Sequence, residues 1–329
     1  MRIFDTRWVG THGIGRFALE LRNRLEGFSP ITLAGRPSEP LDPLSLRRYL
    51  RKMRPELYFS PGFNVPIGNP CPFAFCIHDL NHMYVAGNSS AIKRSYYRFL
   101  VRPAIRRAVA VFTVSEYSRQ VICEWANVNP NSVINVGNGV SGVFRPEGSR
   151  LQERPPYLLH VGNFRPHKNF ERTLAAFANS GLARDLILVA TGVPSAPIIG
   201  KIAELGLSER VHFTGNVTDE ELASLYRGAL GLVFVSCYEG FGLPIVEAMA
   251  CGTPVLTSSV TAMPEVAGDA AILVNPLDVD DIVEGMRRLV TDTPLRQKLH
   301  DAGLIRAKAF SWESTTARVS NGLRLVHAV

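Results

Sequence analysis

Residues Ser236–Gly252 read Ser-Cys-Tyr-Glu-Gly-Phe-Gly-Leu-Pro-Ile-Val-Glu-Ala-Met-Ala-Cys-Gly, and the rest of the chain can be interpreted from this stretch. An apolar run at residues 229–235 precedes it and predicts a buried strand of a parallel sheet. A loop with Gly240 and Gly242 follows, and Pro244 suits the first turn of a helix, where its missing N–H costs nothing. The order strand, glycine loop, helix leaves free N–H groups at a helix N-terminus, and these favour an anion.

Two carboxylates stand beside this predicted anion site, Glu239 in the loop and Glu247 in the helix. A sugar nucleotide accounts for both, because its diphosphate can take the N–H groups while its hydroxyls donate to the carboxylates. A charged acceptor strengthens such a hydrogen bond to roughly 1.5–3 kcal/mol net. The alternative is a pair of surface glutamates near a helix start, where negative charge is mildly favourable. The surrounding Gly-Phe-Gly-Leu-Pro sequence favours the sugar nucleotide.

Glu239, seven residues and then Glu247 resembles the E-x7-E motif of retaining glycosyltransferases of family 4, and the residues between and after the glutamates agree as well. The resemblance is stronger over residues 157–328 than over the first half. It implies an α/β chain of the GT-B fold, with two Rossmann-like domains facing each other across a cleft. It also implies that Glu239 binds the donor sugar and Glu247 the ribose hydroxyls. The neighbouring residues that would contact the donor are Gly240, Phe241, Gly242 and Leu243.

The composition fits two globular domains, with 329 residues, 46% hydrophobic and 20% charged. No run of 18 apolar residues appears, so we expect no membrane-spanning helix. The five cysteines are scattered without a CxxC pair, and the N-terminus lacks the apolar core of a secretion signal. These features predict a reduced, cytoplasmic protein.

Positive charge is concentrated in the first half of the chain. Residues 1–150 hold 20 Lys+Arg against 10 Asp+Glu (net +10), whereas residues 151–329 hold 16 against 19 (net −3). Candidate partners are anionic lipid, a phosphorylated acceptor or nucleic acid. Residues 92–107 interleave six basic residues with aromatics and predict a helix kinked at Pro103. Such a helix can lie on an anionic membrane surface, or it can be an ordinary helix packed through its aromatic stripe.

Both halves alternate predicted strands and helices, which favours two Rossmann-like domains. We place them at residues 1–145, the acceptor domain, and 146–329, the donor domain, because residues 137–156 are rich in Gly and Pro and read as a linker. The resemblance implies that the last helix, which begins near Ser311, crosses back onto the first domain.

The first domain opens with a predicted strand at residues 2–5, a glycine-rich loop and a helix from Ile14, and a second strand is expected at 31–34. As a nucleotide fingerprint this glycine pattern is weak. The resemblance places Gly13 and Gly15 near the donor phosphate and the acceptor.

A later predicted strand, residues 73–77, ends in His78 and Asp79. Polar residues at the carboxyl end of a parallel strand lie where α/β folds bind ligands. The alternative is a histidine that caps the next turn. The resemblance implies that His78 lies against the donor sugar, with Asp79 beside it.

In the second domain, the loop at residues 162–169 places basic groups between a strand and a helix, where they can meet a diphosphate. The alternative is a solvated loop with ordinary charges. Family members carry an arginine directly after the glycine and a lysine six residues after it. Lys168 matches the lysine, but Asn163 stands in the place of the arginine. Arg165, or a protonated His167, would then supply the missing charge.

A metal is not expected. Asp278-Val-Asp280-Asp281 has the form of a DxD metal motif, but it opens a predicted helix, where aspartates cap free N–H groups. The resemblance implies that helix dipoles and basic side chains take the place of a metal. It also places Gly215 and Val217 beside the nucleobase.

The predicted function is transfer of a hexosyl group, mannose or rhamnose, from a nucleoside-diphosphate sugar to a glycan or lipid-linked polysaccharide. GDP-mannose is favoured as donor because the Arg-Pro-His-Lys-Asn loop resembles that of mannosyl- and rhamnosyltransferases, and UDP-sugars stay open. No cofactor is expected, and retention is implied by the resemblance only. Two alternatives stand beside this prediction, a sugar-nucleotide epimerase of the same fold and a basic nucleic-acid-binding protein. No zinc finger, helix-turn-helix or RNA-binding motif supports the second, so we expect no nucleic-acid partner.

Overall fold

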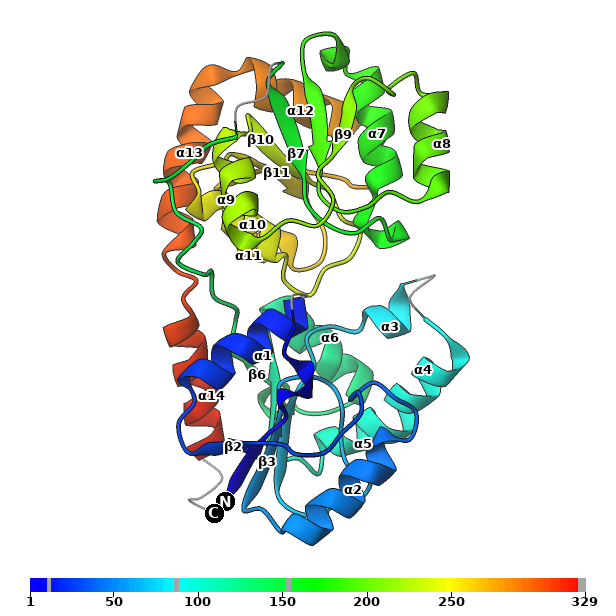
Figure 1. Cartoon of the computed structure of the whole chain (residues 1–329), viewed down its shortest axis with the longest axis vertical. Helices are drawn as coiled ribbons and strands as arrows, with labels where there is room; N and C mark the ends of the chain where they lie inside the picture. Colours follow the sequence, from blue (N-terminus) through cyan, green and yellow to red (C-terminus); the bar gives the residue numbers. More distant parts are fainter. Residues whose placement is uncertain (11–12, 86–88, 152–154, 325–329) are drawn as a thin grey trace. The chain divides into compact units, whose positions relative to one another are not determined.

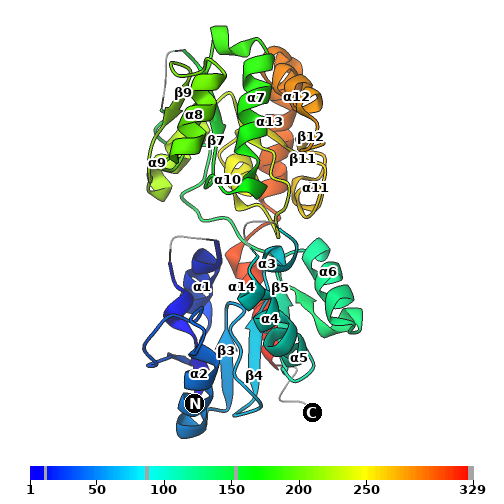
Figure 2. The same ribbon diagram turned by 90° about the vertical axis from the view of Figure 1, so that its right-hand side faces the viewer.

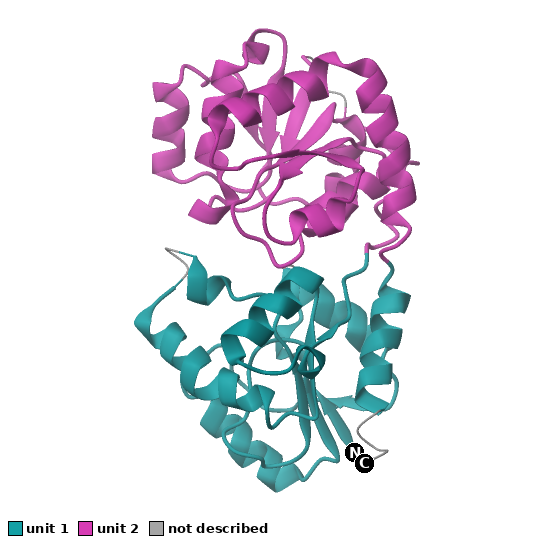
Figure 3. Cartoon of the chain, turned by 180° about the vertical axis from the view of Figure 1, so that it is seen from behind, with its two compact units in different colours: residues 1–139, 311–329 teal, residues 140–310 magenta. Residues whose placement is uncertain are grey.

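The computed structural model describes residues 1–10, 13–85, 89–151 and 155–324. The chain forms two compact units (Figure 3). Unit 1 comprises residues 1–139 and 311–329, and unit 2 comprises residues 140–310. In each unit, helices cover both faces of a sheet whose strands are all parallel, as Figures 1 and 2 show.

The sheet of unit 1 has the strand order β2-β1-β3-β4-β5-β6. Its strands are β1 (Arg2–Phe4), β2 (Phe28–Pro30), β3 (Leu57–Ser60), β4 (Phe73–Cys76), β5 (Ala110–Thr113) and β6 (Ile134–Asn135). Its helices are α1 (Gly13–Arg24), α2 (Asp42–Met53), α3 (Asn81–Tyr84), α4 (Ala91–Tyr96), α5 (Arg102–Ile105), α6 (Glu116–Ala126) and α14 (Trp312–Arg324), with short helices η1 (Thr6–Trp8), η2 (Tyr97–Val101) and η3 (Pro130–Ser132). The central strands β3, β4 and β5 are buried throughout, as expected for a sheet covered on both faces.

One expectation for unit 1 was wrong, and another was confirmed in part. The second strand is β2, at Phe28–Pro30, and residues 31–34 are irregular. β2 lies at the edge of the sheet, where a proline such as Pro30 is tolerated, so the apolar residues after it were mistaken for the strand. The basic stretch predicted as a helix is helical over residues 91–105, where α4, the π-helix η2 and α5 follow one another without a break. Pro103 lies directly after the π-helical segment.

The sheet of unit 2 has the strand order β12-β11-β10-β7-β8-β9. Its strands are β7 (Tyr157–His160), β8 (Ile187–Ala190), β9 (Val211–Phe213), β10 (Gly231–Phe234), β11 (Val255–Ser258) and β12 (Ala271–Val274). Its helices are α7 (Phe170–Asn179), α8 (Ala196–Glu204), α9 (Asp219–Gly228), α10 (Leu243–Ala250), α11 (Met263–Ala267), α12 (Val279–Thr291) and α13 (Thr293–Ala307), with short helices η4 (Pro166–Lys168) and η5 (Leu182–Arg184). The predicted strand, glycine loop and helix around residues 236–252 are confirmed as β10, its following loop and α10.

The chain passes into unit 2 after Gly139, ahead of the expected boundary between residues 145 and 146. The ring of Phe144 packs edge-on against that of Tyr226, with 6.0 Å between centroids. Residues 140–145 therefore belong with unit 2. All five cysteines are free, and no helix in the described ranges is both long enough and apolar enough to cross a bilayer.

Candidate functional site

Two loops at the carboxyl end of the unit 2 sheet bring Lys168 and Glu239 together. Lys168 Nζ lies 2.6 Å from Glu239 Oε1, and the two side chains are 16% and 13% exposed. The ammonium group also lies 5.3 Å from the centroid of the Phe234 ring, within cation–π range. A lysine predicted to bind a diphosphate and a glutamate predicted to bind a sugar thus form one partly buried ion pair.

Asn169 holds the Lys168 loop in place. This residue adopts a left-handed backbone conformation (φ 61°), which asparagine tolerates better than most residues. Its buried side-chain amide donates to the carbonyls of Val235 (2.9 Å) and Pro276 (2.6 Å). The loop after β7 is thereby tied to the loop after β10, which sets Lys168 beside Glu239.

The Glu239 loop is hydrogen-bonded to Thr261, a residue between β11 and α11 whose backbone is strained. Glu239 N–H donates to Thr261 Oγ1 (3.3 Å), and Thr261 has φ of 59°. A β-branched residue in this region costs on the order of 1–3 kcal/mol, and such residues concentrate at ligand sites. Gly242, which precedes α10, has φ of 97°, so the residue type at this position is dictated by the backbone.

Glu247 is almost fully buried in α10, at 4% exposure. The hydroxyl of Tyr226, from α9, donates to Glu247 Oε2 over 3.1 Å. Tyr226 could not be predicted from the sequence, because the two side chains come from different helices of unit 2. The other predicted donor contacts are close by in the chain, with Gly240 and Phe241 buried and Leu243 half-buried.

The other polar residues of the Lys168 loop differ in whether they can supply a positive charge. Asn163 Oδ1 accepts a hydrogen bond from Arg165 N–H (3.3 Å), which gives Asn163 a role in the turn. Burial lowers the pKa of His167, while the charge of Glu239 raises it by less. His167 therefore favours the neutral form and is a poor source of the missing positive charge. Arg165 is exposed and stays the candidate.

Gly215 and Val217 lie in the loop after β9. Gly192 N–H donates to the carbonyl of Gly215 (2.7 Å), so the loops after β8 and β9 are joined. Both glycines have positive φ, and Val217 is half-buried. The arrangement presents backbone groups at the same end of the sheet as Lys168.

His160 is a residue that the sequence reading missed. It ends β7, is fully buried, and its Nδ1 lies 3.2 Å from the carbonyl of Val233. Because a carbonyl can only accept, Nδ1 carries the hydrogen, and Nε2 has no hydrogen-bond partner among the described residues. Burial lowers the pKa of His160 to about 4, so a neutral imidazole lies beneath the Lys168 loop. A lone histidine in an apolar strand carries no motif that could have marked it.

In unit 1, His78 and Asp79 follow β4 as predicted, but they differ in their contacts. His78 Nε2 lies 2.9 Å from the carbonyl of Pro61, and its ring meets the ring of Phe17 edge-on at 4.8 Å. Asp79 Oδ1 accepts from Asn81 N–H (2.9 Å) at the start of α3. The Asp79 carboxylate therefore satisfies the first N–H of α3.

Close packing explains why residue 15 is a glycine. A Cβ at this position would lie 2.5 Å from the carbonyl oxygen of Gly10, so only glycine fits this close approach. Gly13 begins α1 and is exposed. Residues 11–12 of the same loop lie outside the described ranges.

Within the described part of the chain, no group of three or more His, Cys, Asp or Glu side chains is arranged to hold a metal ion. The Asp278 carboxylate accepts from the N–H groups of Asp280 (3.0 Å) and Asp281 (3.3 Å) and so caps α12. The prediction that this DxD sequence is a helix cap is confirmed.

Comparison with known sequences gives a consistent family. Residues 144–305 match the family described as Glycosyl transferases group 1, and residues 6–141 match Glycosyltransferase Family 4. The chain is 30% identical over 291 residues to the O-antigen chain mannosyltransferase B of Escherichia coli, covering 84% of this chain and 76% of that relative. It is 36% identical over 234 residues to the MMP alpha-(1->4)-mannosyltransferase of Mycolicibacterium hassiacum, covering 68% of this chain and 56% of that relative.

Comparison with solved structures gives the fold. Sucrose-phosphate synthase from Thermosynechococcus elongatus matches with a TM-score of 0.81 and 19% identity, over 99% of this chain and 98% of that one. The parallel sheets of both units and the E-x7-E residues agree with the sequence match. The chain therefore belongs to the family 4 glycosyltransferases and is a hexosyltransferase of the GT-B fold.

Proposed function

We propose that this glycosyltransferase moves a mannosyl group from GDP-mannose to a glycan or lipid-linked polysaccharide, with retention of anomeric configuration. The observation that carries the proposal is the Lys168–Glu239 ion pair, which sets a cation and a carboxylate side by side at the end of β7 and β10. The relatives described above are named as mannosyltransferases, which favours mannose over rhamnose as the transferred sugar.

The proposed roles follow from charge. The donor diphosphate takes Lys168 and the N-terminus of α10 as partners, and Arg165 adds a third positive group. Glu239, released from Lys168, then accepts from the hydroxyls of the donor sugar. Glu247, oriented by Tyr226, accepts from the ribose. No metal or cofactor takes part in this proposal.

Catalysis in this proposal is mainly electrostatic. Negative charge grows on the leaving nucleoside diphosphate in the transition state, and groups already in place stabilise it without reorganisation. The resemblance to the family also favours a role for His78 and Asp79 in the transfer step. We assign no carboxylate nucleophile, so retention would proceed by attack of the acceptor on the same face as the leaving group, rather than by a double displacement.

A thermal-shift screen of GDP-mannose, other GDP-sugars, UDP-sugars and ADP-sugars tests the donor. A ligand present at 100 times its dissociation constant should stabilise the protein by about 2.7 kcal/mol. Stabilisation by GDP-mannose, followed by release of GDP only when a glycan acceptor is added, is the expected result. Stabilisation by a UDP-sugar alone would overturn the choice of donor, and conversion of the sugar without an acceptor would indicate an epimerase.

A peripheral membrane contact is part of the proposal, through the surface of α4 and η2. Ile92 is 73% exposed and Phe99 68% exposed, and the Arg98 guanidinium lies 5.8 Å from the centroid of the Phe99 ring. Exposed apolar side chains among cations suit an anionic bilayer surface. Arg106, in contrast, donates to the carbonyls at the end of α6, over 2.8 Å to Asn127. The six basic residues of the stretch therefore do not act alike.

Vesicle co-sedimentation can distinguish specific binding through α4 and η2 from non-specific attraction by the positive charge of unit 1. Replacing Lys93, Arg94 and Arg98 with Gln should weaken binding to anionic vesicles by on the order of 3 kcal/mol, since each cation contributes about 1 kcal/mol. The matched control replaces Arg48, Arg51 and Lys52 of α2, which removes the same charge elsewhere in unit 1. High salt should mimic the first variant, because the attraction decays within about 8 Å at physiological ionic strength. Equal vesicle binding by the two variants would show that residues 91–101 are not a specific membrane-binding surface.

A further inference from the structure

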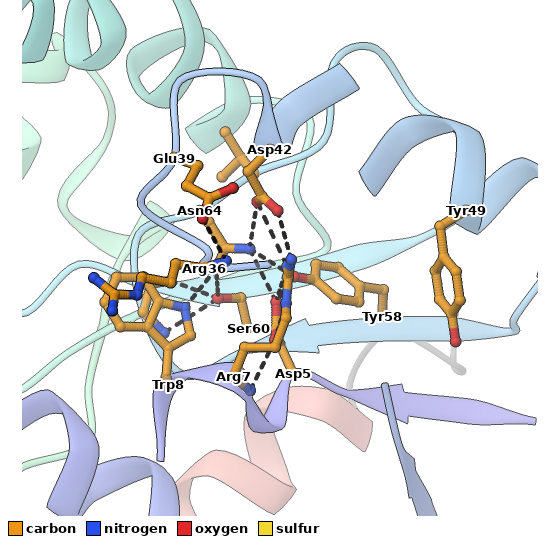
Figure 4. Close-up of polar contacts among 12 residues, drawn as sticks. Asp5, Arg7, Trp8, Arg36, Glu39, Asp42, Tyr49, Tyr58, Ser60 and Asn64 are labelled. Carbon is orange, nitrogen blue, oxygen red and sulfur yellow. Dashed lines mark hydrogen bonds and ion pairs between the residues drawn. The ribbon is translucent and has the colours of Figure 1, made fainter. Parts of the chain in front are cut away.

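Unit 1 contains a buried polar network that no sequence motif predicted (Figure 4). At one end, the Arg7 guanidinium lies between two carboxylates, with Nε 2.8 Å from Asp5 Oδ1 and Nη1 bonded to Asp42 Oδ1. The side chains of Arg7, Asp5 and Asp42 are 8%, 0% and 4% exposed. Tyr58 adds a hydroxyl that donates to Asp5 Oδ2 over 2.6 Å.

Asn64 joins this charged end to a loop. Its Nδ2 donates to Asp5 Oδ2 (3.0 Å) and to the Tyr58 hydroxyl (3.0 Å). Its Oδ1 accepts from Trp8 Nε1–H (2.6 Å) and from the Ser60 hydroxyl. The amide therefore has one orientation only, because reversing it would place oxygen against a carboxylate. A buried network whose members are all satisfied makes its surroundings rigid.

The loop at residues 60–65 is held on both sides of Pro61. Gly62 N–H donates to Ser60 Oγ (3.2 Å), and Gly62 accepts from Cys76 N–H of β4 (3.3 Å). A Cβ on Gly62 would lie 2.3 Å from Cε2 of Trp8, so the indole ring is packed directly on this glycine. The carbonyl of Pro61 is consequently fixed, and it is the carbonyl that meets His78 Nε2 at 2.9 Å.

This contact decides the state of the His78 ring. A carbonyl oxygen only accepts, so Nε2 carries a hydrogen. The edge-on contact with Phe17, at 4.8 Å and 87°, sets the plane of the ring. The Nε2 hydrogen and the orientation of the His78 ring are therefore constrained by Pro61 and Phe17, which both belong to unit 1.

We propose that Ser60 and Asn64 are positioning residues for sugar transfer, which hold the Pro61 carbonyl so that His78 is kept in the Nε2–H form and in one orientation. This inference rests on the proposed role of His78 in transfer. It extends that role to two buried residues that do not themselves reach substrate.

The test separates positioning from stabilisation. Ser60→Ala removes the hydroxyl that anchors the loop, whereas Tyr58→Phe removes a hydroxyl from the far end of the same network. Both variants should lose stability. Ser60→Ala alone should mix the two His78 tautomers, seen in the ¹⁵N spectrum of histidine-labelled protein, with the His78 signals assigned from a His78→Gln variant.

Ser60→Ala should also lower kcat by about tenfold or more with little change in the donor KM, because misplacing a group by ~1 Å can cost on the order of a hundredfold. Trp8→Phe, which removes one donor to Asn64, serves as a second loop variant if Ser60→Ala does not fold. A wild-type His78 signature in the loop variants, or equal losses of kcat in Ser60→Ala and Tyr58→Phe, would overturn the inference. Full activity of His78→Ala would instead overturn the role of His78 in the proposed function, while the tautomer measurement would still stand.

Discussion

The charged side chains described in the two units differ in how deeply they are buried. In unit 2, Lys168 and Glu239 form a single ion pair whose side chains are 16% and 13% exposed. In unit 1, Arg7 is enclosed between Asp5 and Asp42, and all three side chains are less exposed than that pair. The unit 2 pair can exchange partners with a ligand, whereas the unit 1 network is committed to holding chain segments together.

This difference in burial suggests that the polar residues of unit 1 stabilise the fold, whereas those of unit 2 act in catalysis. A buried charge without its partner is strongly unfavourable, so the unit 1 network should affect stability first. A partly exposed pair contributes less to folding, so the unit 2 residues should affect catalysis first. The following four predictions test this contrast, beginning with the largest expected effect.

Arg7→Met should lower the free energy of unfolding by about 3–5 kcal/mol, because it leaves two buried carboxylates without their cation. Urea unfolding followed by circular dichroism measures this loss. Arg24→Met is the control, since Arg24 pairs with Glu20 and Glu313 at a more exposed position and should cost under about 1 kcal/mol. Similar losses in the two variants would show that the unit 1 network is not special.

Lys168→Ala should lower kcat by roughly 10²–10³-fold, about 2.7–4 kcal/mol, because it removes a positive group from the developing charge. The loss of unfolding free energy should be smaller than for Arg7→Met. Asn163→Ala is the matched control in the same loop and should change kcat far less, while Arg165→Ala should resemble Lys168→Ala. Steady-state kinetics with varied donor concentration measures these changes in kcat. Equal effects of Lys168→Ala and Asn163→Ala would show that the assignment of the diphosphate site to Lys168 is wrong.

Stability should fall in acid through His160. Its pKa is about 4 in the folded chain, below the usual value near 6.5, because burial disfavours the charged form. The unfolded chain therefore takes up a proton first as the pH falls from about 6.5 to about 4, and roughly 3 kcal/mol of stability is lost over that window. His167, whose pKa burial also lowers, acts in the same direction. Urea unfolding of His160→Asn, which keeps a donor for the Val233 carbonyl, should show a flatter pH dependence; an unchanged slope would contradict the assignment.

Glu247→Ala should weaken binding of the free nucleoside diphosphate at least about tenfold, through loss of one or two charged hydrogen bonds of roughly 1.5–3 kcal/mol each. Tyr226→Phe should have the smallest effect, below about fivefold, because it removes no bond to the ligand and only loosens the carboxylate that Tyr226 orients. Isothermal titration calorimetry measures both. Unchanged affinity in Glu247→Ala would remove Glu247 from the ribose site.

Much of the candidate site in unit 2 could be predicted because its signals are local. Gly242 before α10 and Pro244 in its first turn are close in sequence, and so are the Asp278 cap and α12. The family match of the glutamates also depends on neighbouring residues. Tyr226 and Asn169 could not be predicted, because their partners are distant in the chain, 21 residues away for Glu247 and 107 for Pro276.

Sequence alone determined the α/β class, the strand–loop–helix around Glu239 and Glu247, and the family, because each depends on periodicity or on short motifs. Only the tertiary structure decided that Lys168 meets Glu239, that Arg7 is shared by Asp5 and Asp42, and that the Pro61 carbonyl meets Nε2 of His78. The physical reason is the same in each case. A side chain at the end of a parallel strand meets residues from whichever strand lies next to it in the sheet, and strand order follows from how the helices and strands pack together rather than from distance along the chain.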